Sequence, residues 1–287
     1  MANKVLYDIE CYKNVFLCSI QDVDTKKKVI WEISNRKNDL NEIRIFFNSY
    51  KQYLISFNGI HYDNCMIMFV LTNNFNTTEE LLAKTKEFSD IIINNNGEVD
   101  WWRDRKYSKY KYHNKWIDVD LFLYWSKMLR ISKKLSLKGL AIQLNYPVVQ
   151  ELPFDPAMSL NHEQIDELIH YNSVHDLGIL DLLLDKMIEE VKLRQYIRKE
   201  YNSDCMSWDA PKIASELLLN EYCKLTQEDY KEVKNSRFTS FNKLDLPKIN
   251  FQLNVFKDVY EGMSNATTEY SKEVVLLKNN KIGRAHV

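Results

Sequence analysis

Two features of the sequence predict an α/β protein in which a mixed sheet is flanked by helices and followed by a partial second region. Short apolar strands come first along the chain, at residues 4–10, 15–21 and 28–33. Segments with helical periodicity then alternate with further strands. Because each helix buries its apolar stripe against a neighbouring layer, this order predicts a sheet covered by helices. A chain of 287 residues can bury a large core without a disulfide or a structural metal.

The alternating elements begin after the third strand. An amphipathic helix is predicted over residues 39–50, an apolar strand over residues 53–57 and a second helix over residues 61–71. The dipeptide Asn58-Gly59 is a turn signal and separates that strand from the helix after it.

A second group of elements follows residue 115. A strand is predicted over residues 116–122 and a short helix over residues 136–144, and three prolines then indicate an extended link. Asn161 is a good N-cap, and helical periodicity continues from it, with one irregularity, to about residue 200.

The chain divides into three parts by composition. Residues 1–200 hold the predicted sheet and its helices. Residues 201–281 hold one clear helix, which opens near Ala210, and are otherwise polar, so they are either a linker or the start of a second domain. Residues 282–287 resemble one translation frame of a sequencing adapter, so we expect an artefact at the end of a truncated reading frame, with a genuine short tail as the alternative.

Composition excludes several kinds of site. The six glycines lie more than twenty residues apart, whereas the GxxxxGK[ST] and GxGxxG phosphate-binding loops need clustered glycines. The five cysteines form no CxxC pair, which argues against a zinc ribbon and favours a reducing compartment. With no signal peptide and no apolar run long enough to span a membrane, we expect a cytoplasmic protein. The net charge of −1 means that a nucleic-acid partner would need a local basic patch.

Two acids share one face of the first strand. Asp8 and Glu10 end an apolar run, and residues i and i+2 of a strand point the same way. Acids are common at strand ends, so this pair alone is a weak signal.

Two further acids lie in line with the apolar stripes of predicted helices. Asp63 precedes Met66 and Val70 on one stripe, and Asp176 precedes Leu180 on another. The helix dipole also favours an acid at a helix N-terminus, so Asp63 alone has an ordinary structural explanation.

Four carboxylates at one end of a sheet would repel each other unless cations lay among them. No cluster of cysteine and histidine accompanies these acids, so oxygen-preferring Mg²⁺ or Mn²⁺ fits best. Two such ions can activate water and stabilise the leaving oxygen in phosphodiester hydrolysis. The sequence therefore predicts two divalent metal ions held by four acids, Asp8, Glu10, Asp63 and Asp176.

The motifs around these acids resemble those of the DEDD 3′–5′ exonucleases. Asp8-Ile9-Glu10 matches their D-x-E motif, and the segment from Asn58 to Asp63, NGIHYD, matches N-x-x-x-[FY]-D in full. The segment Lys134–Leu140 is similar to the connection before the third motif in bacteriophage replicative polymerases, so the resemblance is greatest to the proofreading domains of family B DNA polymerases.

This resemblance covers about residues 1–200. It implies an RNase H-like fold, two divalent metals and release of nucleoside monophosphates from a 3′ end. Residues 201–281 would then begin a polymerase-type domain, and a viral protein of this kind would act in the host cytoplasm.

The third motif departs from the Y-x-x-x-D pattern of the tyrosine subtype. Tyr171 lies five residues before Asp176, and Asn172 occupies the usual tyrosine position. Five residues of α-helix turn about 140° past a full turn, so Tyr171 reaches the acids only through a π-bulge or by preceding the helix. The histidine subtype places its base five residues before the acid. We expect Tyr171 to orient the attacking water, with His175 as the second candidate.

Basic and aromatic side chains are the candidates for contacts with nucleic acid. Residues 101–116, WWRDRKYSKYKYHNKW, combine cations that bind phosphates with rings that stack on unpaired bases. A β-hairpin with alternating exposed and buried residues explains this pattern equally well. The predicted nucleic-acid-binding set, which follows from the resemblance and from nearness to the acids, is Phe57, Asn58, Tyr62, His175 and Lys138. Lys138 has a solvated helix lysine as its alternative.

Asp118 and Asp120 flank Val119 on a predicted strand. They could support the metal site, but such acids are more often edge residues, so we leave them outside the catalytic set.

These expectations describe a 3′–5′ exodeoxyribonuclease, the N-terminal proofreading part of a phage-type DNA polymerase. Its partners would be a single-stranded DNA 3′ end or a primer terminus, and other replication proteins, with no membrane. One alternative is a free-standing DEDD nuclease that acts on RNA or oligonucleotides. Another is a catalytically inactive RNase H-like module that binds nucleic acid, which the displaced tyrosine favours and the intact acids oppose.

Overall fold

The computed structural model describes residues 4–94, 106–111, 115–128, 135–235, 240–241, 267–270, 274–278 and 285–286. The chain forms two compact units, Met1–Ala214 and Ser215–Val287. The first unit holds the predicted sheet and all of the predicted site residues.

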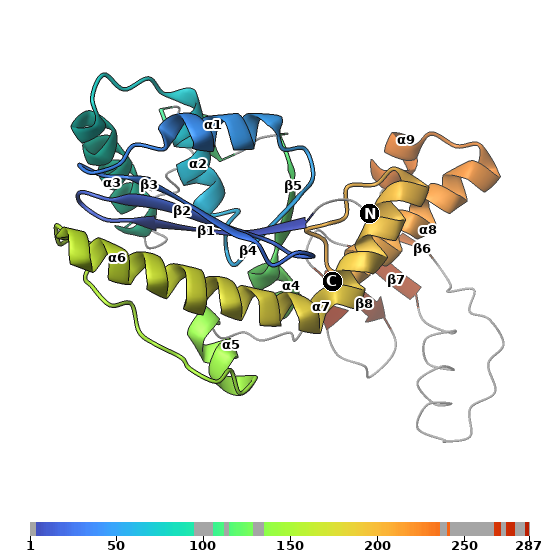
Figure 1. Ribbon diagram of the computed structural model, residues 1–287. Coiled ribbons are helices and arrows are strands. Elements are labelled where there is room, and N and C mark those ends of the chain that lie inside the picture. The colour runs from blue at the N-terminus through green and yellow to red at the C-terminus, as the bar shows by residue number, and fades with distance from the viewer. Residues whose placement is uncertain are drawn as a thin grey trace. The chain divides into compact units, whose positions relative to one another are not determined.

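A five-stranded mixed sheet forms the centre of the first unit (Figure 1). Its strands, in the order β3-β2-β1-β4-β5, are β3 (Lys28–Ile33), β2 (Phe16–Asp22), β1 (Lys4–Cys11), β4 (Tyr53–Ser56) and β5 (Ile117–Asp120). The first three strands form an antiparallel meander, and β4 and β5 run parallel to β1. The predicted mixed α/β architecture is therefore confirmed.

Helices cover both faces of this sheet (Figure 1). One face packs against α1 (Leu40–Ser49), α2 (Asp63–Thr72) and α3 (Thr78–Asn94). The other face packs against α4 (Leu121–Met128), α5 (Leu137–Gln143), α6 (His162–Tyr171) and α7 (Leu177–Tyr201). Since both faces are covered, side chains of β1 are buried on alternate sides, with Tyr7 and Ile9 in one core and Leu6 in the other.

Short irregular elements connect these helices and strands. A π-helical turn, η3 (Asn172–Asp176), joins α6 to α7 and accounts for the one irregularity in the predicted long helix. A 3-10 turn, η2 (Ser108–Tyr110), precedes β5. The N-cap predicted at Asn161 is present as a capping box with Gln164.

Two parts of the chain differ from the predicted elements. Residues 121–122 begin α4 and do not extend the strand, because the Asp120 carboxylate accepts the Phe122 N–H at 3.0 Å and caps the helix. The helix α3 has no predicted counterpart, since its buried face includes the small polar residues Thr85 and Ser89, which weaken the apolar periodicity.

The second unit begins within α8 (Ala210–Thr226), which is followed by α9 (Tyr230–Asn235). An antiparallel sheet in the order β6-β7-β8-β9 follows, formed by β6 (Ser240–Phe241), β7 (Thr267–Tyr270), β8 (Val274–Lys278) and β9 (Ala285–His286). No helix in the described part of the chain has both the length and the apolar character needed to cross a bilayer.

Candidate metal centre

Asp8 and Glu10 lie at the carboxyl end of β1, in the middle of the sheet. They alternate with Tyr7 and Ile9, which are buried against the α1–α3 side. The two acids therefore share the opposite face with Leu6, the face that α7 covers.

Asp176, the last residue of the π turn η3, lies close to Asp8 and Glu10. One carboxylate oxygen from each of Asp8, Glu10 and Asp176 lies within 4.8 Å of the other two. The β1 acids and Asp176 are more than 160 residues apart in the chain, so only the folded sheet and the helix crossing it bring them together.

Asp63 lies beside this group but is not one of its three clustered members. It is the first residue of α2, is buried, and accepts a hydrogen bond at 3.0 Å from the Ile9 N–H, between the two β1 acids. The fourth predicted acid is thus next to the cluster, with its Oδ1 held by the strand backbone.

The pKa values of the four carboxyls are raised, as expected where negative charges crowd in a dehydrated site. Loss of hydration, with the charges of Asp176 and Asp63, raises the pKa of Glu10 to about 8. Burial is also the main cause that raises the pKa of Asp63 to about 7 and that of Asp176 to about 6. For Asp8, burial and the three neighbouring carboxylates raise the pKa well above its ordinary value.

These residues fit a hard divalent cation. The donors are carboxylate oxygens, which Mg²⁺ and Mn²⁺ prefer. A cation among them would compensate the negative charges that burial deprives of hydration.

Tyr171 reaches the acids because the turn before Asp176 is π-helical. The Leu177 N–H bonds to the Asn172 carbonyl, an i→i+5 pattern that widens the turn by one residue. As a result the buried Tyr171 hydroxyl donates to Asp176 Oδ1 at 3.3 Å. The π-bulge that the spacing of the third motif required is present.

His175, the second candidate for orienting water, is buried in the same turn. Its ring centroid lies 5.6 Å from that of Tyr171, and within the described part of the chain its Nδ1 has no hydrogen-bond partner.

Lys138 lies on α5 close to the acids. Its Nζ is 5.7 Å from the centre of the Tyr171 ring and 3.0 Å from Glu151 Oε2. Its positive charge lowers the pKa values of Glu10 and Asp176. Lys138 therefore contributes to the field of the site, and its side chain is only 23% exposed.

The turn of the second motif is held by an acid that sequence analysis left out. Asp120 is buried, and its carboxylate accepts the N–H groups of Asn58 at 2.8 Å and Ile60 at 3.3 Å. Asn58 has a left-handed backbone (φ 64°). A Cβ on Gly59 would lie 2.0 Å from Ser56 Oγ, so this tight turn requires glycine. Asp120 does lie on an edge strand, β5, but its carboxylate is buried and holds this turn.

Phe57 and Tyr62 flank this turn. Phe57 is half-buried and packs edge-to-face on Phe122, with ring centroids 5.5 Å apart. Tyr62 packs against the core, and its hydroxyl is 2.8 Å from Ser89 Oγ. Both lie on segments next to Asp63, as the motif predicts.

Only part of the basic and aromatic segment 101–116 can be placed. Residues 101–105 and 112–114 lie outside the described residues. Tyr110 and Trp116 are buried, with Tyr110 packed on Phe69 and Phe88, so these two rings are not available to stack on bases.

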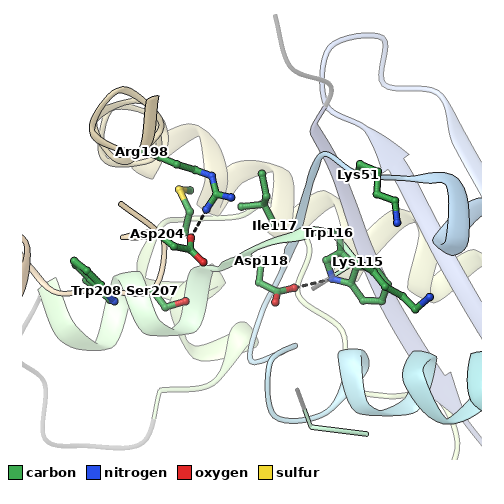
Figure 2. A pocket seen from close by; sticks show the side chains of 10 residues that line it. Lys51, Lys115, Trp116, Ile117, Asp118, Arg198, Asp204, Ser207 and Trp208 are labelled. Carbon is green, nitrogen blue, oxygen red and sulfur yellow. Dashed lines mark hydrogen bonds and ion pairs between the residues drawn. The ribbon is translucent and has the colours of Figure 1, made fainter. Parts of the chain in front are cut away.

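A cavity of about 490 Å³ lies away from the acids, at the amino-terminal end of β5 (Figure 2). Its lining includes Lys51, Arg198, Asp204 and Trp208. Figure 2 shows the ion pair between Arg198 and Asp204. None of the predicted site residues lines this cavity.

One residue of the site, Asn172, had no predicted role there. The Asn172 amide donates to Asp8 Oδ2 at 2.5 Å. A signal for it was present, because Asn172 occupies the position of the tyrosine in the Y-x-x-x-D pattern.

Comparison of the chain with protein-family models, with curated proteins and with solved structures gave no significant match.

Proposed function

We propose that the chain is a metal-dependent 3′–5′ exonuclease that removes nucleotides from the 3′ end of single-stranded or frayed DNA. The observation that carries this proposal is the convergence of Asp8, Glu10 and Asp176 within 4.8 Å, with Asp63 beside them. These are the acids of the three motifs that resemble the DEDD exonucleases, and they come from segments far apart in the chain.

The architecture supports an RNase H-like fold. A mixed sheet with helices on both faces fits the fold that the resemblance implies, and the acids lie on its central strand and on a helix crossing it. On this proposal the chain is the proofreading part of a phage-type DNA polymerase.

Two divalent ions, Mg²⁺ or Mn²⁺, would be held by the four carboxylates and would supply Lewis-acid stabilisation of the phosphodiester and an acidified water. The protein's own groups place the reactants. Tyr171 is suited to orient the attacking water, because burial and the charges of Asp176 and Glu10 raise the pKa of its hydroxyl well above the ordinary value. The hydroxyl therefore stays protonated at neutral pH and acts as a hydrogen-bonding group, not as a base.

The predicted nucleic-acid contacts include a lysine near the acids and two aromatic residues of the second motif. Lys138 brings a positive charge to the side of Glu10 and Asp176, where a phosphate would bind. Phe57 and Tyr62 precede and follow the Asn58-Gly59 turn in the chain, and Tyr62 is adjacent to Asp63. We propose that these residues contact the terminal nucleotides.

The test uses a single-stranded oligonucleotide labelled at its 5′ end. With Mn²⁺ the protein should shorten this DNA stepwise from the 3′ end and release nucleoside monophosphates, and EDTA should stop the reaction. Asp8→Asn should abolish it. Asp181→Asn removes another acid, one on α7 that pairs with Lys26 at 2.7 Å, and should leave it unchanged. Equal nucleolysis by wild type and Asp8→Asn would reject the proposal.

The same assay with an RNA oligonucleotide of the same sequence tests the alternative of a free-standing nuclease that acts on RNA. A proofreading domain should degrade DNA faster than RNA, whereas that alternative predicts the reverse. No polymerase activity is expected from this chain. The displaced tyrosine was the feature favouring an inactive module, and the contact of the Tyr171 hydroxyl with Asp176 through the π turn supports an active site instead.

A further inference from the structure

We propose that Asn172 is a positioning residue of the metal centre, which holds the Asp8 carboxylate in its cation-binding orientation through the π turn. This inference rests on the proposed metal centre and adds to it a fifth, uncharged residue. It concerns a residue at the position where the tyrosine subtype has its tyrosine.

The contact is direct and buried. Asn172 is fully buried, and its Nδ2 donates to Asp8 Oδ2 at 2.5 Å. The amide also helps to lower the pKa of Glu10, the other acid of β1. The hydrogen bond to Asp8 Oδ2 restricts rotation of the Asp8 carboxylate and leaves Asp8 Oδ1 to face a cation.

The other end of the Asn172 side chain is unsatisfied. Asn172 Oδ1 is buried and has no hydrogen-bond partner in the part of the chain that the structure describes. A buried acceptor without a partner is destabilising by about 1–3 kcal/mol, and beside a group of carboxylates it is suited to accept from a cation-bound water. This unsatisfied oxygen is an observation independent of the acidic cluster.

The π turn that presents Asn172 is supported from outside the helix. Lys28 on β3 donates to the Ser173 carbonyl at 2.5 Å, and the Tyr146 hydroxyl donates to the Val174 carbonyl at 3.4 Å. Gly178 leaves room for Tyr146, because a Cβ there would lie 2.2 Å from the Tyr146 hydroxyl. These contacts satisfy carbonyls in the widened turn, so the irregularity is built into the fold.

The π turn thus serves two side chains at once. Tyr171 is directed to Asp176, and the next residue, Asn172, is directed to Asp8. In a regular helix with the same sequence these neighbours could not both face the acids, since successive residues lie about 100° apart.

The test measures metal binding itself, apart from nuclease activity. Mn²⁺ is titrated by calorimetry into wild type, Asn172→Ala and the control Ser173→Ala, in the absence of DNA. Ser173 is in the same turn, and its hydroxyl donates to the His170 carbonyl and to none of the acids among the described residues. We expect about 10- to 100-fold weaker Mn²⁺ binding for Asn172→Ala, the usual effect of removing a residue that orients a ligand, and no change for Ser173→Ala.

Thermal unfolding of the metal-free variants shows whether Asn172 positions Asp8 or only packs in the core. Asn172→Leu fills the same volume without polar atoms and replaces Asn172→Ala if the alanine variant does not unfold cooperatively. Unchanged Mn²⁺ affinity in a folded Asn172 variant overturns the inference, and so does failure of both variants to fold, since Asn172 would then act in packing. If wild type binds Mn²⁺ and degrades no DNA, the proposed function fails while this inference stands.

Discussion

The acids of the centre show, at the scale of single residues, how a binding site can oppose the stability of its own fold. Burial raises the pKa of Glu10 to about 8, that of Asp63 to about 7 and that of Asp176 to about 6, and the charges of Asp176 and Asp63 add to the shift of Glu10. The unfolded chain has no such crowding, so its carboxyls lose their protons near pH 4. The folded, metal-free protein therefore holds protons that the unfolded chain releases.

We predict that the metal-free protein becomes less stable as the pH rises. Between about pH 4 and pH 8 the folded state binds more protons than the unfolded state, so the free energy of unfolding falls with each increase in pH. The stabilisation is complete below the unfolded pKa and is lost as the pH passes the folded pKa of Glu10, about 8.

Thermal unfolding in EDTA at pH 5 and pH 8 measures this effect. Glu10→Gln should raise the stability at pH 8 by on the order of 1 kcal/mol or more, since one pKa unit corresponds to about 1.4 kcal/mol. Mn²⁺ should restore stability at pH 8, and its affinity should rise with pH, because the ligands must be deprotonated. A metal-free stability that increases from pH 5 to pH 8 would contradict the assignment of these pKa shifts.

Tyr171 carries the second prediction at this scale. Tyr171→Phe removes the hydroxyl that lies 3.3 Å from Asp176 Oδ1 and keeps the ring in the core. We expect kcat to fall by about 10- to 100-fold with little change in Mn²⁺ affinity. His175→Gln is the comparison, and a loss of kcat confined to that variant would assign the water-orienting role to His175.

At the scale of elements, the third motif depends on one extra residue in a helix. The extra residue forms the turn η3, and the helices on either side are regular. Lys28 lies on β3, the edge strand opposite β5, and bonds to this turn. An edge strand of the sheet therefore supports the turn that carries Asp176.

We predict that Lys28→Met destabilises the protein and also slows the reaction. The lost bond joins the Lys28 ammonium group to the Ser173 carbonyl. Because Lys28 is exposed and water competes for this bond, we expect a loss of about 0.5–1.5 kcal/mol, the usual net value of a hydrogen bond. Lys27→Met removes an exposed lysine next to it and should have little effect. Urea unfolding and kcat, measured on both variants, check this, and equal stability of the two would show that the π turn does not need Lys28.

At the scale of the whole molecule, the described residues form three buried apolar clusters that belong to the first unit. These clusters lie between Val5 and Met206. Every residue of the proposed centre lies within the same range.

We therefore predict that a chain ending at Asn235 keeps the fold and the centre. Its melting temperature should stay within about 2–4 °C of that of the full chain, the shift that 1 kcal/mol produces in a domain of this size. Mn²⁺ affinity should be unchanged. Calorimetric unfolding and Mn²⁺ titration measure both, and loss of cooperative unfolding would show that residues 236–287 are needed for the first unit.

Much of the fold follows from local pattern. The bounds of β1, β2, β3 and α1 agree with the predicted segments to within about two residues, because apolar alternation and helical periodicity are strong there. The strand predicted to end at residue 122 ends at Asp120, where α4 begins. The aromatic residues of this segment favour a strand by propensity, but the capping contact from Asp120 starts a helix.

The sequence by itself determined which acids could form a centre, since strand alternation and helical stripes assign Asp8, Glu10, Asp63 and Asp176 to inward positions whatever the details of packing. It also determined that Tyr171 needs a π-bulge, because the spacing of five residues does not suit a regular helix. Only the tertiary structure decided that the bulge forms, since its free carbonyls are satisfied by Lys28 and Tyr146 from remote segments. The partners of Asn172 and Asp120 are likewise contacts across the fold, and no local pattern records a contact between residues that distant in the chain.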